Sequence, residues 1–352
     1  MTKRGTPRWP AAAARLAELL PPARLHPAVL AWAAARPKAE PWAVALSGGS
    51  DSVALLLLLW AHWPARRARL SAYHFDHRLR GAASAADARF CARACAALGV
   101  PLVAGRRPSP RPLPGAAEAR EARFAFLAGA LARRKTKVLW LGHQQDDIAE
   151  TLLMRLARGS GTAGLAAPRP VHAFPPERRG GRGLFHLRPL LTLKKAELAA
   201  ALRAAGAAWR EDASNAGPGH FRNRVRAEVI PAWVQAAERD ALAGAARSRE
   251  LLEEDQAALE AWVDALAPVA ADLSLSVSGL AGRPRAVVRR ALHRWLLAQR
   301  QPSRLSRQGF DGLLRAVEAG APVRHSLGSH GFAVIRAGKL RFQPMRKPST
   351  PH

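Results

Sequence analysis

A glycine-rich turn between an apolar strand and an apolar helix constrains the fold more than any other feature. Residues 42–46 (WAVAL) form a predicted buried strand, residues 47–52 (SGGSDS) a turn, and residues 53–60 the start of a helix. Two further clear strands are predicted at residues 70–75 and 137–141, with helical segments between them. Strands that alternate with helices in this way favour an α/β fold with a doubly wound, mostly parallel sheet.

The remaining elements divide the chain into a larger α/β part and a smaller, mainly helical part. We expect the first 41 residues to be frayed before a short helix and residues 159–182 to form a loop rich in Gly, Pro and Arg. After about residue 226, long helices are predicted at 236–266 and 285–299, followed by short strands within 323–342. The predicted domains are an extension (1–25), the α/β domain (26–225), a helical C-terminal domain (226–342) and a tail (343–352).

The charge of the chain indicates an anionic partner. The 352 residues carry 55 Lys and Arg against 26 Asp and Glu, a formal net charge of +29. Residues 1–225 alone carry 36 of these basic residues against 14 acidic ones, a surplus of 22. A surplus of this size favours nucleic acid as a partner, because phosphate neutralisation releases counterions. Codon bias in a GC-rich genome explains Arg over Lys, but it does not by itself explain the twofold excess over acids.

Several protein classes are excluded by composition. Two cysteines cannot supply a disulfide framework or a four-thiolate metal site. Cys91 and Cys95 lie four residues apart on a predicted helix, where we expect both to pack in the core. The longest apolar run, residues 53–61, is too short to cross a bilayer. We therefore expect a cytoplasmic protein without membrane contact, and we leave open whether it is a homodimer.

The turn at residues 47–52 has the chemistry of a phosphate-binding loop. Glycines allow backbone N–H groups to approach an anion, and the following helix presents unpaired N–H groups at its positive end. A carboxylate at Asp51 would repel bare phosphate, but it suits a Mg²⁺ ion held against phosphates. The alternative is a capped strand–helix turn, where Ser and Asp are favoured in any case. The sequence GxxxxGK[ST] is absent, so this is not a Walker loop.

Acidic and histidine side chains follow two other predicted strands. Asp146, Asp147 and Glu150 fall in the first turns of one helix, directly after His143. Helix capping accounts for one such acid, and three acids exceed what capping needs. We therefore predict a functional role for them. His74, with Asp76 and His77, ends the strand at 70–75, at the edge where ligands bind in open α/β sheets. Zinc binding there would need a further ligand that the sequence does not supply.

These segments together resemble a known family. The SGGSDS loop is similar to the SGGxDS loop of the N-type ATP pyrophosphatases (PP-loop superfamily). Four further segments extend the match in order across roughly residues 42–231 to the tRNA(Ile)-lysidine synthetase family. They are residues 74–81 (HFDHRLRG), 141–151 (LGHQQDDIAET) with 155–161 (RLARGSG), 188–191 (RPLL), and 211–215 (EDASN) with 222–226 (RNRVR). Beyond residue 235 the similarity is slight, and the C-terminal region is shorter than in many members.

The resemblance implies a fold, a reaction and a set of substrates. The fold would be that of the adenine nucleotide alpha hydrolases. The reaction would be ATP-dependent adenylation of the wobble cytidine in an isoleucine tRNA with a CAU anticodon, releasing pyrophosphate. Free L-lysine would then displace AMP and leave lysidine. The implied enzyme is a carbon–nitrogen ligase that uses ATP and Mg²⁺, and the C-terminal domain would bind the tRNA.

The resemblance also implies roles for particular residues. The ATP contacts would be Ser47, Gly48, Gly49, Ser50, Asp51, Ser52, His74 and His143. Asp51 would hold Mg²⁺ through the ATP phosphates, and the catalytic acids would be Asp51, Asp146, Asp147 and Glu150. Arg120, Arg123, Arg222 and Arg224 would contact phosphate or the tRNA, although each can also be read as a solvated helix residue. The acids have two expected tasks, holding Mg²⁺–ATP and gripping the ammonium groups of lysine, and none is assigned to one task.

Two alternatives stay open from the sequence. A tRNA thiolation enzyme of the same superfamily usually carries cysteines as CxxC or a cluster, and this chain has only Cys91 and Cys95 on a helix. A non-catalytic basic RNA-binding protein would not need the intact loop at 47–52 or the acids at 146–150. Both features therefore favour the ligase.

Overall fold

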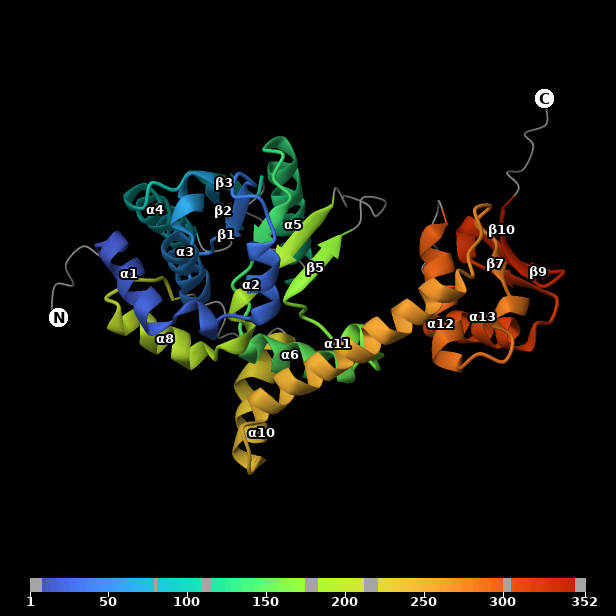
Figure 1. Ribbon diagram of the computed structural model, residues 1–352. Coiled ribbons are helices and arrows are strands. Elements are labelled where there is room, and N and C mark those ends of the chain that lie inside the picture. The colour runs from blue at the N-terminus through green and yellow to red at the C-terminus, as the bar shows by residue number, and fades with distance from the viewer. Residues whose placement is uncertain are drawn as a thin grey trace. The chain divides into compact units, whose positions relative to one another are not determined.

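The computed structural model describes residues 8–78, 81–108, 116–174, 183–211, 221–299 and 305–345 (Figure 1). The chain forms two compact units, Met1–Leu252 and Glu253–His352, which divide within the long helix α11 (Ala241–Leu266). The sequence placed the start of the second domain earlier, at residue 226, and those four domain limits stay predictions. Each unit is described by itself below.

The first unit is built on a six-stranded sheet with the order β3-β2-β1-β4-β6-β5. Its strands are β1 (Trp42–Ala45), β2 (Leu70–Asp76), β3 (Leu102–Arg106), β4 (Val138–Trp140), β5 (Val171–Phe174) and β6 (Leu184–Leu187). All neighbouring strands are parallel except β5, which runs antiparallel to β6 at the edge. The carboxyl ends of β1, β2, β4 and β6 therefore lie along one edge. The predicted doubly wound, mostly parallel sheet is confirmed.

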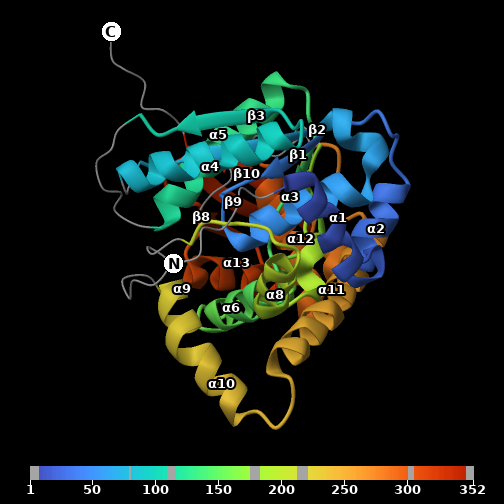
Figure 2. The same cartoon turned by 90° about the vertical axis from the view of Figure 1, so that its left-hand side faces the viewer.

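Helices cover both faces of this sheet (Figure 2). One face is covered by α1 (Trp9–Leu19), α2 (Pro27–Ala34), α3 (Ser50–His62), α4 (Ala82–Ala97) and α8 (Lys195–Ala204), and the other by α5 (Ala116–Arg133). The unit also contains α6 (Gln145–Leu156), α7 (Thr162–Leu165), α9 (Phe221–Arg224), α10 (Ile230–Ala236) and the first part of α11. Successive side chains of β1 point to opposite faces of the sheet and so pack against different helices. Trp42 and Val44 join the core with α1, α3, α4 and α8, whereas Ala43 faces α5. This two-sided burial explains the continuous apolar sequence of the strand.

Two stretches differ from the sequence-based expectations. The region before residue 41, expected to be frayed, contains α1, whose Ala12, Ala13 and Leu16 are buried against α3 and α8. Alanines let this helix approach its neighbours closely, a packing effect that composition does not reveal. The predicted loop at 159–182 contains the short helix α7 and the strand β5. Strand β5 forms because its backbone pairs with β6, although Gly, Pro and Arg residues flank it in the sequence.

The second unit combines helices with a four-stranded antiparallel sheet, as the sequence predicted in outline. The sheet has the order β7-β10-β9-β8, formed by β7 (Leu275–Ser276), β8 (Val323–Ser326), β9 (Gly331–Arg336) and β10 (Lys339–Pro344). Helices α12 (Arg285–Ala298) and α13 (Arg307–Ala319) pack on it around the fully buried Trp295. Gly331 has φ +139°, and a Cβ there would lie 2.2 Å from the carbonyl oxygen of Gln343. Only glycine fits this close approach of β9 and β10.

Candidate active site

The loop between β1 and α3 is closed by one hydroxyl group. The backbone N–H groups of Ser47 and Gly48 each donate to Oγ of Ser52 over 3.2 Å. The same hydroxyl donates to the carbonyl oxygen of Gly49 over 3.0 Å. Ser52 therefore organises the loop from inside, while the N-terminal end of α3 faces outward with its positive dipole. The residues predicted to bind phosphate form one continuous turn.

Glycines in and near this loop allow close packing. Gly48 has φ +93°, and a Cβ there would lie 3.3 Å from Sγ of Cys91. A Cβ on Gly142, in the segment after β4, would lie 2.9 Å from the carbonyl oxygen of Asp51. The segments that follow β1 and β4 thus touch at the carboxyl edge of the sheet. This is the point where strand order reverses, and ligands of open α/β sheets bind there.

Asp51 is a partly buried carboxylate that forms no ion pair with a described Lys, Arg or His side chain. Its hydrogen bond comes from Oγ of Ser50 at 2.9 Å, and no ion pair to it occurs within the part of the chain that the structure describes. Burial, together with the nearby charge of Asp147, raises the pKa of this carboxyl group above its ordinary value. Burial makes the ionised form of this carboxyl group unfavourable, and a bound divalent cation would supply the compensating positive charge.

Helix α6 begins very differently, because its acids already have partners. The backbone N–H of Gln144 donates to Asp147 over 3.0 Å, and Oε1 of Gln144 accepts from the N–H of Asp146 over 2.5 Å. Asp146 in turn accepts from the backbone N–H of Lys195, the first residue of α8, over 2.9 Å. Asp146 therefore joins the starts of two helices, and Asp147 caps its own helix.

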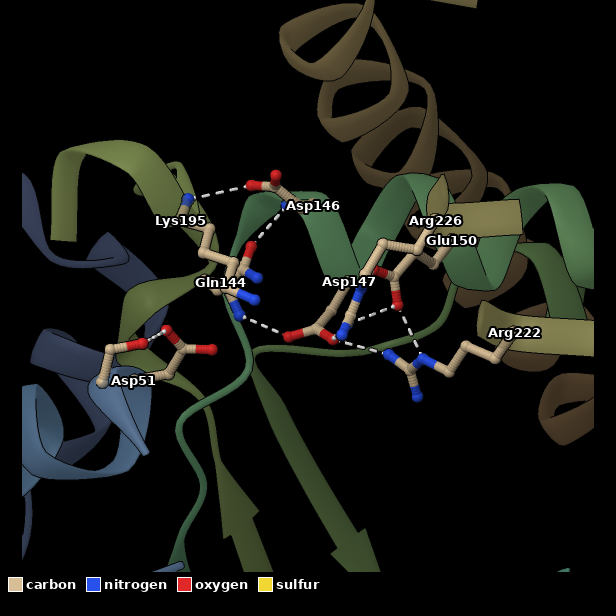
Figure 3. Close-up of polar contacts among 9 residues, drawn as sticks. Asp51, Gln144, Asp146, Asp147, Glu150, Lys195, Arg222 and Arg226 are labelled. Carbon is tan, nitrogen blue, oxygen red and sulfur yellow. Dashed lines mark hydrogen bonds and ion pairs between the residues drawn. The ribbon is translucent and has the colours of Figure 1, made fainter. Parts of the chain in front are cut away.

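Glu150 is the most buried acid of the cluster, with only 1% of its side chain exposed, and two arginines hold it (Figure 3). Nε of Arg222 lies 2.6 Å from one carboxylate oxygen, and Nε of Arg226 lies 2.6 Å from the other. Arg222 also contacts Asp147 over 2.5 Å. The sequence predicted Arg222 as a tRNA or phosphate contact. The structure places it first of all in an ion-pair network with two of the predicted catalytic acids.

His74 and His143 have one ring nitrogen bound and the other without a protein partner among the described residues. Nδ1 of His74 pairs with the carbonyl oxygen of Leu46 at 2.9 Å, and its Nε2 is buried without a partner. Nε of Arg188 donates to Nδ1 of His143 over 3.2 Å. Burial, followed by the charge of Arg188, holds the pKa of His143 well below its ordinary value.

Two adjoining cavities open at this edge of the sheet. One has a volume of about 510 Å³ and is lined by the phosphate-loop residues Ser47, Asp51 and Ser52, by His74 and by Arg123. The other, of about 600 Å³, is lined by an apolar floor and by five arginines, which are Arg120, Arg155, Arg169, Arg188 and Arg222. His143, Phe124 and Leu127 line both cavities. Among the residues that the structure describes, no Asp or Glu lines the larger cavity, so its chemistry favours an anionic or aromatic ligand.

The arginines predicted on α5 lie in these walls. The guanidinium groups of Arg120 and Arg123 lie 4.9 and 5.5 Å from the ring centroid of Phe124. Burial and neighbouring arginines lower the pKa of both side chains. Two neighbouring guanidinium groups with no ion pair to an acid among the described residues suit a phosphate group as a ligand. Arg224, also predicted as a tRNA contact, lies exposed on α9 and lines neither cavity.

Two residues of the site, Arg188 and Phe124, received no role from the sequence. Arg188 lies in a segment that matched the family pattern, RPLL. Arg226, in RNRVR, is predicted from the sequence to form a basic stripe for RNA with Arg222 and Arg224, or to make solvated contacts at a helix start; in the structure it pairs with Glu150. Phe124 directly follows Arg123 on α5, and no sequence motif points to it. Residues 79–80 and 212–215, which belong to matched segments, lie outside the described residues.

Other chemistries receive little support. Cys91 and Cys95 are free and buried, and burial raises the pKa of each thiol to about 12. Within the described ranges, no group of three or more His, Cys, Asp or Glu side chains is arranged to hold a metal ion. No helix in the part of the chain that the structure describes is long and apolar enough to span a membrane.

Comparison with known proteins gives a consistent result. The family described as PP-loop domain matches residues 24–233. A tRNA(Ile)-lysidine synthase of Salinispora arenicola is 39% identical over 315 residues, 85% of this chain and 89% of that protein. Proteins with the same name from Symbiobacterium thermophilum and Geobacter sulfurreducens are 41% and 36% identical, over 60% and 78% of this chain. The chain spans only about half the length of those two, 43% and 58%.

The matched region contains the whole six-stranded sheet, the loop at residues 47–52 and the acids of α6. The match to the Salinispora protein extends over most of both chains, and because it covers more residues than the first unit contains, it includes part of the second unit. Fold, site and sequence similarity thus agree with the resemblance found in the sequence. The chain belongs to the PP-loop domain family and, within it, to the tRNA(Ile)-lysidine synthase family.

Proposed function

We propose that this chain is an ATP-dependent ligase that forms lysidine in an isoleucine tRNA with a CAU anticodon, using free lysine. The observation that carries the proposal is the pair of adjoining cavities that share His143, Phe124 and Leu127. The adenylation step joins ATP to a base of the tRNA, so it needs two sites whose ligands meet at a common wall. The names of the relatives supply the particular tRNA and the particular product.

The smaller cavity suits ATP. The start of α3 offers backbone N–H groups and a positive dipole to phosphates, and Ser47 and Ser52 line the cavity beside them. The donor set also fits Mg²⁺, because Asp51 is a carboxylate without a cation among the described residues. When bound, Mg²⁺ would neutralise charge on the departing pyrophosphate. Asp51 would hold the ion at the phosphate end of the cavity.

The larger cavity suits the target nucleotide. Its arginines can pair with backbone phosphates, and Phe124, Phe174, His172 and His186 offer ring faces and edges to a base. An unpaired base in an anticodon loop can be turned out of the stack at small cost. A cation such as lysine is disfavoured in the arginine-lined part of this cavity. We therefore place the base here and the amine nearer to the acids of α6.

The amine of lysine must lose a proton before or during its attack. Glu150 is engaged by two arginines, and Asp147 by Arg222 and the N–H of Gln144. The proton would pass to a carboxylate that keeps a free oxygen lone pair. Asp146, with one oxygen bound to the N–H of Lys195, retains such an oxygen and is the acid that we assign to this task.

The decisive experiment uses labelled free lysine, Mg²⁺–ATP and two tRNA transcripts. One is the isoleucine tRNA with CAU, and the other is the methionine tRNA that shares this anticodon. We expect label only in the first, stable to the mild alkali that removes aminoacyl esters. Label in both would remove the discrimination between the two tRNAs from the proposal.

The remaining outcomes separate the alternatives. Release of AMP without label in either tRNA would replace lysine by another nucleophile, with sulfur as the first to test. A sulfur-transfer role is disfavoured because both thiols are buried with pKa values of about 12, so neither is a thiolate at neutral pH. Neither label nor AMP, from folded protein, would support the non-catalytic RNA-binding alternative.

A further inference from the structure

His143 occupies the wall between the two cavities, and its ring is fixed from one side. The donor is Arg188, the residue that follows β6, whose Nε lies 3.2 Å from Nδ1 of the imidazole. Arg188 is itself held, because its Nη1 donates to the carbonyl oxygen of Arg169 over 2.7 Å. Only 8% of Arg188 is exposed. A buried, anchored guanidinium therefore sets the position of the ring.

This contact determines where the imidazole carries its proton. A guanidinium has only donors, so Nδ1 of His143 must accept, and the proton of the neutral ring must lie on Nε2. A second ring proton at Nδ1 would face the N–H of Arg188 directly. The groups around the ring add to this effect, since Arg120 and Arg123 on α5 and Arg222 on α9 are all positive. His186 on β6 is neutral as well, because burial and Arg188 lower its pKa to about 3.

The second ring nitrogen is available to a ligand. Within the described part of the chain, Nε2 of His143 has no hydrogen-bond partner, and the residue lines both cavities. A neutral Nε2–H is a donor that neither gains nor loses its proton near neutral pH. Such a group can stabilise charge on an oxygen without taking part in proton transfer.

We propose that Arg188 is a positioning residue that locks His143 as the neutral Nε2–H tautomer, so that His143 donates to an α-phosphate oxygen and never acts as a base. The inference rests on the proposed function for the identity of that oxygen. Negative charge gathers on the α-phosphate oxygens when the base oxygen attacks phosphorus, and again when AMP leaves the base. One fixed donor serves both steps, and the proton of the amine goes to a carboxylate instead.

The direct test is nitrogen NMR of ¹⁵N-histidine-labelled full-length protein, with His143→Gln identifying the His143 signals among the 12 histidines. We expect an unprotonated Nδ1 and a protonated Nε2 that stay unchanged between about pH 5.5 and pH 8.5. In Arg188→Met, the ring should exchange between tautomers and titrate closer to its ordinary pKa of about 6.5. A wild-type His143 that titrates within this range, or carries its proton on Nδ1, overturns the proposal.

Kinetics provide a second readout. His143→Leu should lower kcat about 100-fold with little change in KM for ATP, because a charge-stabilising donor is lost. His143→Gln places an amide N–H near the Nε2 position and should recover at least tenfold of that loss. Equal activity of the Leu and Gln variants would overturn the donor role. If the wild-type protein transfers no lysine but His143 shows the locked tautomer, the proposed function fails while the positioning by Arg188 stands.

Discussion

The starts of helices α3 and α6 follow neighbouring parallel strands at the same edge of the sheet, yet their acidic side chains differ in charge pairing. At α3, the loop is organised by Ser52, and the carboxylate of Asp51 meets no cation among the described residues. At α6, Asp147 and Glu150 are neutralised by Arg222 and Arg226 (Figure 3). Equal positions in the fold therefore do not imply equal electrostatics.

These acids therefore differ in role: Asp51 at the start of α3 is suited to ligand binding, and Asp147 and Glu150 of α6 stabilise the fold. An uncompensated carboxylate costs stability and is kept where a ligand supplies the missing charge. A carboxylate with two arginine partners stabilises the native state and orients those arginines. We therefore expect mutations at the start of α3 to affect chemistry more than folding. For Glu150 we expect the reverse.

The largest expected effect is the loss of catalysis in Asp51→Ala. Without this carboxylate, the ion that neutralises the departing pyrophosphate has no protein ligand at the loop, so tRNA-dependent pyrophosphate release should fall about 1,000-fold. The melting temperature should not fall. The matched variant is Asp146→Asn, which keeps an oxygen for the N–H of Lys195 and should lose less activity. Normal turnover of Asp51→Ala would remove Asp51 from the mechanism.

The second effect concerns stability at α6. Glu150→Gln removes the more buried of the two acids that pair with Arg222 and Arg226, an acid that is 1% exposed, and leaves only Asp147 to both arginines. Because both arginines are about one-third exposed, we expect a loss of about 2 kcal/mol in the free energy of unfolding of the first unit. Denaturant titration measures this loss. Glu228→Gln, at an exposed position in the helical segment Val225–Val229 that carries Arg226, is the control and should change stability little. Equal stability of both variants would contradict the supporting role of Glu150.

The smallest effect is a gain of stability in Asp51→Asn at neutral pH. The folded-state pKa of Asp51 is raised, so its ionised form destabilises the native state once the pH exceeds the ordinary carboxyl pKa. Removing the charge should raise the melting temperature by about 2–4 °C at pH 7. The gain should shrink as the pH falls toward the ordinary carboxyl pKa of about 4 and vanish below it, because the wild-type carboxyl group is then protonated in the folded and the unfolded protein alike. A gain that does not depend on pH would point to packing instead of charge.

Parts of the fold could be predicted because their signal is local. The strands β1, β2 and β4 lie close to their predicted positions, since apolar runs and glycine turns mark them. Helix α1 and strand β5 were not predicted. The first depends on alanine packing against α3 and α8, and the second on pairing with β6. Helix α13 was also missed, although its Leu313, Leu314 and Val317 are buried in the core of the second unit.

In the candidate site, too, the features with a local sequence signal were predicted and those that depend on tertiary contacts were not. The motifs predicted the loop at 47–52, the acids of α6 and the histidines, because matched residue types recur at fixed spacing. They did not predict that Arg222 pairs with Asp147 and Glu150, more than 70 residues away in the chain. They gave no role to Arg188, whose contact with His143 joins the ends of β6 and β4.

The sequence by itself determined the alternating α/β architecture, the phosphate loop and the family, because each depends on residues that are neighbours in the chain. Only the tertiary structure decided which charges are compensated. Parallel strands bring their carboxyl ends to one edge regardless of sequence separation, so Asp51, His143 and Arg188, from the segments after β1, β4 and β6, lie at that edge. The burial of each carboxylate and its distance from the nearest arginine then decide whether it is free to bind a cation or is already paired. Those quantities exist only in the folded chain.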